Sequence, residues 1–401
     1  MANASHRQAV AMPEALSTRA ARLEPFDWYR EMRAETPVRY DDDRRVWDVF
    51  RYDDVRRVLA DSETFAADPS RTDGIGFTDG ARPQSLRGSD PPRSALIQSL
   101  DGDRFQSDTV DALAPHVRGI ADELLDDATD GGRLDVVGDL AAPLSAVVVA
   151  ELLGVPTDDR DRFEQWSAAL VTDAGTGATA ERPHGTIREV RAYVADRLEQ
   201  RRAIPRDDLL THVATTGPDG HRPSEGDVLN DCLDLLGTAT ATTTALVGNA
   251  VRSLDEQPTR YEEVAGDRDA LAATIEEVLR YRSPVQALPR VATTDTELRG
   301  HAIEAGDPVV AWLGSANRDE AQFDDPDAFR PDRRPTGHVA FGHDSHCGPD
   351  GSLTRLQARV ALGRLLARLD GIEVVDEPLE PMPSAFYCGV ERLPIRFDAA
   401  D

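Results

Sequence analysis

Apolar residues recur at helical spacing over most of this chain. From about residue 108 onward they fall on one helix face at the i, i+3, i+4 spacing, as Val110, Leu113, Val117, Ile120 and Leu124 do. The same type of pattern predicts further helices over 25–35, 52–60, 136–153, 159–171, 186–202, 207–214, 269–281 and 353–369. The pattern therefore predicts a mainly helical protein.

One predicted helix, over 225–257, is too long for an ordinary surface helix. Its centre, 235–247, carries no charge and is rich in small residues and threonine. A helix that is apolar or uncharged all round is buried. We therefore expect this segment to run through the middle of the molecule.

Strands are predicted in two places. Residues 38–40 and 45–50 flank an acidic turn at Asp41 to Asp43, which favours a small hairpin, and 284–311 alternate in the manner of strands. Residues 69–93 are rich in Gly, Ser, Asp and Pro, which predicts a long loop and a candidate substrate lid. The first 22 residues are expected to be flexible.

Charge narrows the possible partners. The chain carries a net charge of −28, and every basic residue other than histidine is arginine. Such a surface repels nucleic acid and anionic membranes. The acidic residues are spread along the chain, which indicates a surface solvated in concentrated salt, as in a halophile.

The compartment is predicted from what the sequence does not contain. No apolar run is long enough for a signal peptide or a membrane span. The three cysteines, Cys232, Cys347 and Cys388, are widely spaced and form no CxxC pair. They suggest neither a disulfide framework nor a zinc site, so we expect a cytoplasmic protein.

A series of motifs occupies the C-terminal half. Glu277 and Arg280 lie three apart and so share one helix face. They are followed by Ser283-Pro284-Val285, Arg290, the run Ser315-Ala316-Asn317-Arg318-Asp319, Phe323, Asp325-Pro326, Phe329, Pro331 and Arg333. In this order and spacing the motifs resemble the cytochrome P450 family.

The resemblance extends from about residue 25 to 397. It includes Trp47, Tyr52 and Asp54-Val55 near the start, Ala142-Pro143-Leu144 and Glu151 to Pro156 in the middle, and Gly389 and Glu391 to Pro394 near the end. It implies a mainly α (α+β) P450 fold, as a single domain over 23–401 with a small β-rich part. It also implies that Glu277, Arg280 and Arg333 form a buried, structural ion triad.

The resemblance implies a haem b cofactor held by a cysteine thiolate. The family's loop has the pattern Phe-Gly-x-Gly-x-His-x-Cys-x-Gly, and residues 341–350 match it at Phe341, Gly342 and His346. Gly348 stands at the thiolate position, whereas Cys347 lies one place early. A compensating deletion and insertion would still bring Cys347 to the iron, so Cys347 remains the candidate metal ligand.

Other positions that the family uses around haem also differ. Ser94 and Gln98 stand where the family has a His and an Arg for a propionate, and Ala241 replaces the acid that relays protons to oxygen. Thr242, the candidate catalytic residue, is retained. By resemblance Arg290 and His346 are propionate partners; the alternatives are an ordinary surface arginine and a loop histidine.

Three hypotheses remain open on the sequence. The first is a haem-thiolate monooxygenase that takes electrons from a ferredoxin-type donor and oxidises a small apolar substrate, with impaired haem and proton-relay motifs. The second is a haem-free or redox-inactive P450-fold protein that binds a ligand or recruits a partner. The third, a haem protein with His343 or His346 on iron, fits least well because imidazole lacks the electron push of a thiolate.

Overall fold

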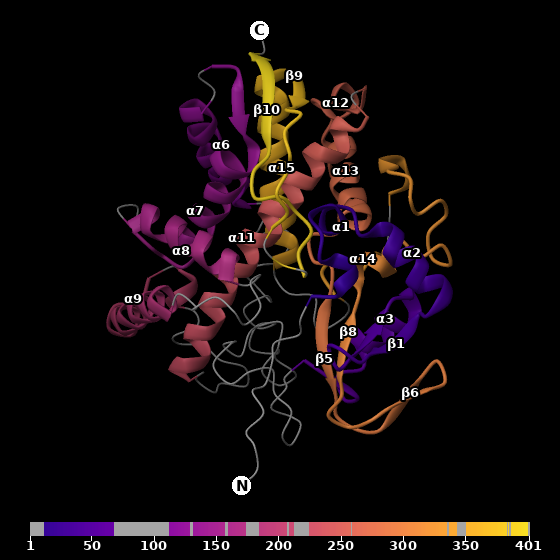
Figure 1. Cartoon of the computed structure of the whole chain (residues 1–401). Helices are drawn as coiled ribbons and strands as arrows, with labels where there is room; N and C mark the ends of the chain where they lie inside the picture. Colours follow the sequence, from indigo (N-terminus) through magenta and orange to yellow (C-terminus); the bar gives the residue numbers. More distant parts are fainter. Residues whose placement is uncertain are drawn as a thin grey trace.

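The computed structural model describes residues 12–67, 112–128, 131–156, 159–173, 184–206, 208–211, 224–257, 259–334, 337–342, 350–382, 384 and 386–399. Helices fill one side of the molecule, and most of the strands gather on the other (Figure 1). The fold is mainly helical with small β-sheets, as the sequence predicts. No helix among the described residues is both long and apolar enough to cross a membrane.

The helices agree closely with the apolar pattern. They are α1 (Arg19–Leu23), α2 (Phe26–Glu35), α3 (Tyr52–Ala60), α6 (Ala114–Ala128), α7 (Ala142–Leu152), α8 (Arg160–Asp173), α9 (His184–Ala203), α11 (Glu225–Asp255), α12 (Thr259–Val264), α13 (Arg268–Tyr281), α14 (Leu313–Ala316) and α15 (Asp350–Arg368). Short 3-10 turns form η1 (Glu14–Leu16) and η7 (Pro331–Arg333), and a π-helical turn forms η4 (Val136–Ala141).

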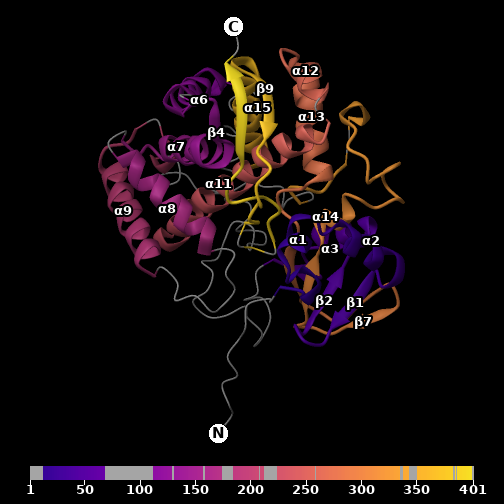
Figure 2. The same cartoon turned by 45° about the horizontal axis from the view of Figure 1, so that its top comes forward.

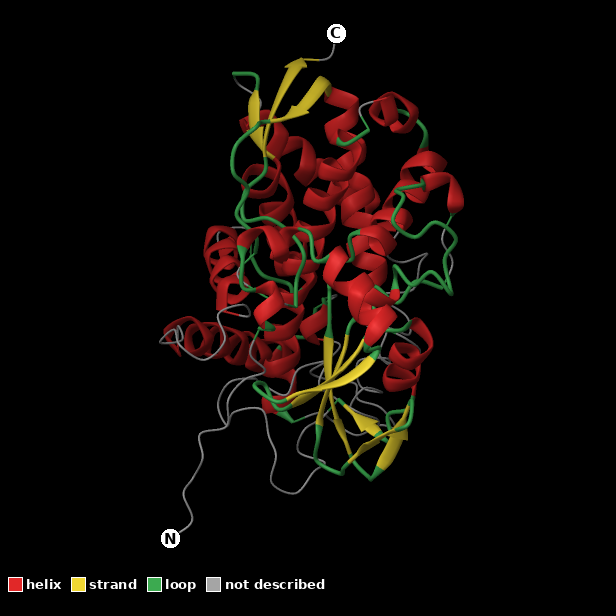
Figure 3. Ribbon diagram, turned by 45° about the vertical axis from the view of Figure 1, so that its right-hand side comes forward, coloured by secondary structure: helices red, strands yellow, loops and turns green. Residues whose placement is uncertain are grey.

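The strands form three sheets (Figure 3). The largest has the order β1-β2-β8-β5-β3, with β1 (Val38–Asp41), β2 (Val46–Val49), β8 (Pro308–Ala311), β5 (Leu288–Ala292) and β3 (Phe65–Ala66). The second has the order β4-β10-β9, with β4 (Arg133–Asp135), β10 (Pro394–Ala399) and β9 (Leu369–Val374), and the third pairs β6 (Thr296–Leu298) with β7 (His301–Ile303). The predicted hairpin is confirmed, with Val38 opposite Val49.

Helix α11 lies at the centre of the helical part (Figures 1 and 2). It packs against α7, α8, α9, α13 and α15. Within 235–247 every residue is buried except Gly237 and Thr238, which are partly buried. The prediction of a central, buried helix is therefore confirmed.

The structure differs from the sequence-based expectation in two segments. The predicted helix over 136–153 begins with the π-helical turn η4, in which Asp135 accepts a hydrogen bond from the amide of Val137 at 3.2 Å. Residues 12–22, part of the segment expected to be flexible, form η1 and most of α1, and Leu16 is buried in a cluster with Tyr29. Residues 207 and 212–214 of the predicted helix over 207–214, and all of the predicted lid at 69–93, lie outside the described residues.

Candidate active site around the central helix

The three charged residues of the predicted triad meet in space. Arg280 donates from Nε to Glu277 Oε2 at 2.9 Å and from Nη2 to Oε1 at 2.7 Å. Arg333, the last residue of η7, donates from Nε to Glu277 Oε1 at 3.3 Å. Glu277 and Arg280 are fully buried. Because Glu277 and Arg280 are both buried, replacing either residue would leave the other charge in the core without one of its counter-ions, which is destabilising.

The guanidinium of Arg280 also holds three backbone carbonyls. It donates to the carbonyl oxygens of Asn317, Pro326 and Ala328 at 3.0, 2.8 and 3.1 Å. Asn317 in turn accepts from the amide of Val339 at 2.7 Å and donates to Ser283 Oγ at 2.8 Å. This network ties α13 to the chain that leads to residue 342, just before the candidate haem loop.

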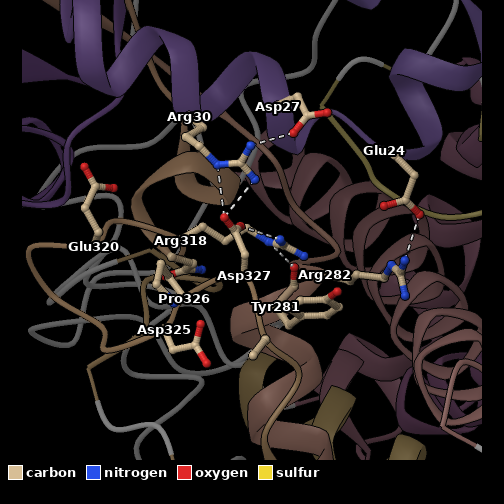
Figure 4. A network of polar contacts seen from close by, with 12 residues as sticks. Glu24, Asp27, Arg30, Tyr281, Arg282, Arg318, Glu320, Asp325, Pro326 and Asp327 are labelled. Carbon is tan, nitrogen blue, oxygen red and sulfur yellow. Dashed lines mark hydrogen bonds and ion pairs between the residues drawn. The ribbon is translucent and has the colours of Figure 1, made fainter.

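Arg318 joins the N-terminal helices to the same core (Figure 4). Its guanidinium carbon lies 3.5 Å from the ring centre of Phe26 and 3.9 Å from that of Tyr281. The side chain also donates to Asp327 at 2.9 Å and to the carbonyl of Tyr281 at 2.9 Å. Burial lowers the pKa of Arg318, and the nearby tyrosine and carboxylate oppose that shift. The cation is held by stacking as well as by charge.

The middle of α11 carries a group of buried threonines. Thr242 Oγ1 lies 2.9 Å from the carbonyl oxygen of Thr238 and 3.2 Å from Oγ1 of Thr354 on α15. A hydroxyl has one proton, so Thr242 donates it to the carbonyl while Thr354 donates to Thr242. Among the described residues, the hydroxyls of Thr240, Thr243 and Thr244 have no hydrogen-bond partner.

Thr354 is the residue of this site that the sequence did not reveal. It lies in α15, where the apolar pattern of Leu353, Leu356 and Val360 drew attention to core packing alone. The available signal for Thr354 was a hydroxyl between these apolar positions. Its role as a partner of Thr242 became clear only from the packing of α11 against α15.

Of the remaining candidate residues, only Arg290 lies in the part of the chain that the structure describes. Arg290 lies on β5, is 1% exposed and donates to the carbonyl of Pro289 at 2.9 Å. It is therefore a buried arginine and not a surface one. Cys347 and His346 fall in 343–349, and Ser94 and Gln98 fall in 68–111; both segments lie outside the described residues.

The two described cysteines are core residues, as their positions predict. Cys232 on α11 and Cys388 are both buried and not disulfide-bonded. Burial raises the pKa of each thiol. Both groups therefore stay protonated near neutral pH and are poor nucleophiles and poor metal ligands.

The described residues fit the haem that the resemblance implies in two respects. Small buried side chains at Ala241 and Ala245 leave one face of α11 uncharged and apolar, which suits an apolar macrocycle. The buried cation of Arg290 suits a propionate, because a buried carboxylate requires a charged or hydrogen-bonding partner.

Comparison with known proteins identifies the family. The family model "Cytochrome P450" matches residues 177–343. The chain is 38% identical over 392 residues to "Cytochrome P450 109" of Bacillus spizizenii, covering 96% of this chain and 94% of the relative. It is 38% identical over 379 residues to "Erythromycin C-12 hydroxylase" of Saccharopolyspora erythraea, covering 92% and 94%.

A solved structure supports the same assignment. CYP109E1 from Bacillus megaterium in complex with corticosterone is 34% identical, with a TM-score of 0.83 and coverage of 94% of this chain and 99% of that one. The sequence match, the fold and the buried ion triad all agree. This chain belongs to the cytochrome P450 family, whose members use haem.

Proposed function

We propose that this protein keeps the scaffold of a P450 monooxygenase for a small apolar substrate, but binds haem weakly and relays protons poorly. The observation that carries the proposal is the environment of Thr242. Its neighbour Ala241 is a methyl group where the family has an acid, and the Thr242 hydroxyl is bonded to Thr238 and Thr354. No carboxylate at position 241 supplies a proton to it.

Haem, when bound, supplies the oxygen-activating chemistry of the family. On this proposal Arg290 and His346 hold its propionates, and Cys347 is the only candidate thiolate near the loop. The family's other two propionate partners are Ser94 and Gln98 in this chain. Losing a charged partner of a buried group costs about 1 to 3 kcal/mol each, so two losses, about 2 to 6 kcal/mol together, lower affinity about thirtyfold or more.

The substrate class is proposed from relatives and from the core. One relative is named an erythromycin hydroxylase, and another was solved with corticosterone. In this chain Ala241 and Ala245 form a buried apolar cluster with Met382, and Tyr387 packs against it. An apolar compound would pack against such a surface, and a ferredoxin-type protein would supply electrons.

The test is the absorbance spectrum of purified protein titrated with haem, then reduced and exposed to carbon monoxide. We expect weak or incomplete haem binding and no thiolate-type carbon monoxide band. The Bacillus spizizenii relative, prepared in parallel, serves as the positive control. A Cys347→Ser variant is expected to give the same spectrum as the parent.

Two outcomes would change the proposal. A full complement of haem with the thiolate band, abolished by Cys347→Ser, would overturn it and establish a rearranged loop with full monooxygenase competence. Complete absence of haem binding, together with measurable binding of a steroid by the haem-free protein, would favour the haem-free ligand-binding alternative.

A further inference from the structure

A single carboxylate is bonded to residues on both sides of segment 343–349, which carries His346 and Cys347. Glu276 on α13 precedes the triad residue Glu277 and faces different partners. Its Oε2 lies 3.0 Å from Nε2 of His338, and its two oxygens accept from Nε and Nη2 of Arg355 at 2.5 and 3.0 Å. His338 lies five residues before the segment, and Arg355 six residues after it.

The histidine is oriented for this contact. Its Nδ1 accepts a hydrogen bond from the amide of Ala340 at 3.3 Å, so its proton is on Nε2, which donates to Glu276. Burial alone would raise the pKa of Glu276, but the bonds from His338 and Arg355 lower it to about 2. The carboxylate is therefore charged throughout the neutral range.

Arg355 also contacts both flanks directly. Its guanidinium carbon lies 4.9 Å from the ring centre of Phe341, and its Nη1 donates to the carbonyl of Gly351 at 3.3 Å. A side chain at position 351 would meet Arg355 at 3.2 Å and the Phe341 ring at 3.5 Å. Residues 341 and 351 are thus packed against the same planar cation.

We infer that Glu276 is a positioning residue that fixes the two ends of segment 343–349 relative to each other. It acts through His338 and Arg355, whereas Glu277 one residue later braces the fold. Every partner in these contacts is a side-chain or backbone group of this chain, so the clamp forms whether haem is bound or not. The inference shares with the proposed function only the assignment of Cys347 to the haem loop.

The rate at which Cys347 is alkylated by a water-soluble thiol reagent tests this inference in haem-free protein. Cys232 and Cys388 are buried thiols with raised pKa values, so they should react more slowly than Cys347. Peptide mass spectrometry can therefore follow the alkylation of Cys347 separately. In Glu276→Gln we expect alkylation of Cys347 to be about fivefold faster, which corresponds to about 1 kcal/mol in the opening equilibrium. Glu276→Asp, which keeps the charge, should recover part of the parent rate.

Asp122→Asn is the matched control. Asp122 on α6 pairs with Arg364 and Arg368, which lie farther along α15, the helix that carries Arg355. The side chain of Asp122 is 33% exposed, compared with 31% for Glu276. We expect this variant to leave the alkylation rate of Cys347 unchanged. Hydrogen exchange of the amides at 337–342 and 350–356 should rise in Glu276→Gln and not in the control.

An unchanged alkylation rate and unchanged exchange in Glu276→Gln would overturn the inference, as would a parent Cys347 that already reacts like a free thiol. If Glu276→Gln does not fold, Arg355→Lys keeps the charge but loses the two-pronged contact, and the same acceleration is expected. A thiolate band in the carbon monoxide test would refute weak haem binding and leave this result untouched.

Discussion

The Glu277–Arg280 pair on α13 and the middle of α11 differ in how far their buried polar groups are satisfied. The Arg280 guanidinium donates hydrogen bonds to Glu277 and to three backbone carbonyls. In α11, by contrast, Thr240, Thr243 and Thr244 have hydroxyls without partners among the described residues. A buried hydroxyl without a partner costs about 1 to 3 kcal/mol. The first region stabilises the fold, whereas the second retains polarity that packing does not require.

This difference separates the residues that stabilise the P450 fold from the residues that serve the proposed chemistry. The triad and Asn317 connect only to protein groups, so they do not depend on a cofactor. A buried polar group without a partner in a native protein calls for an explanation, such as a catalytic role or a bound water or ion. The unpartnered threonines of α11 therefore support the proposal that this part of the helix lies at the active site.

The largest expected effect comes from breaking the ion network. Replacing Arg280 by Met leaves Glu277 buried with Arg333 as its one remaining cation, and we expect a loss of about 3 to 5 kcal/mol in the free energy of unfolding. Denaturant unfolding in concentrated salt measures it. A loss below about 1 kcal/mol would mean that this region does not brace the fold.

A smaller effect is expected where the cation is stacked. In Arg318→Lys the charge is kept, but the planar contact with Phe26 and Tyr281 is lost, so we expect destabilisation of about 1 to 2 kcal/mol. Arg30→Lys is the control, because Arg30 pairs with the same Asp327 and its side chain is 53% exposed. That variant should change stability by less than about 0.5 kcal/mol. Equal effects in both would contradict a role for stacking.

Two neighbouring threonines should respond with opposite signs. Thr243→Val removes a hydroxyl without a partner and should stabilise the protein by up to about 1 kcal/mol. Thr242→Val leaves the buried Thr354 hydroxyl without its partner and should destabilise by about 1 kcal/mol. Thermal unfolding of the two variants and the parent measures both. A loss of stability in both variants would mean that α11 is packed like an ordinary core helix.

The last test is the pH dependence of the Glu276 contacts. Its pKa is about 2 in the folded protein, compared with an ordinary value of 4.5, so its stabilisation is complete above about pH 4.5 and is lost as pH falls toward 2. The difference in unfolding free energy between the parent and Glu276→Gln should therefore shrink on acidification. Urea unfolding at several pH values measures it, and a difference that grows below pH 4 would contradict the assignment.

Elements whose evidence is local were predicted well from the sequence. Helix α11 was predicted over 225–257 and ends at Asp255, because a long uncharged stretch has few alternatives to a buried helix. The meeting of Glu277 and Arg280 followed from their i, i+3 spacing. The small helix α12 and the sheet of β4, β9 and β10 were not predicted, because short segments carry little periodicity.

The candidate site was predicted only in part. From the sequence alone we identified the family and the central helix, and both are confirmed, whereas the roles of Thr242 and Ala241 stay predictions. Only the tertiary structure showed that Arg290 is buried, that Thr242 meets Thr354 across 112 residues, and that Glu276 holds His338 and Arg355, which lie 62 and 79 residues away. Spacing along a helix fixes which face a side chain occupies, but the partner on the opposite face depends on how distant segments pack.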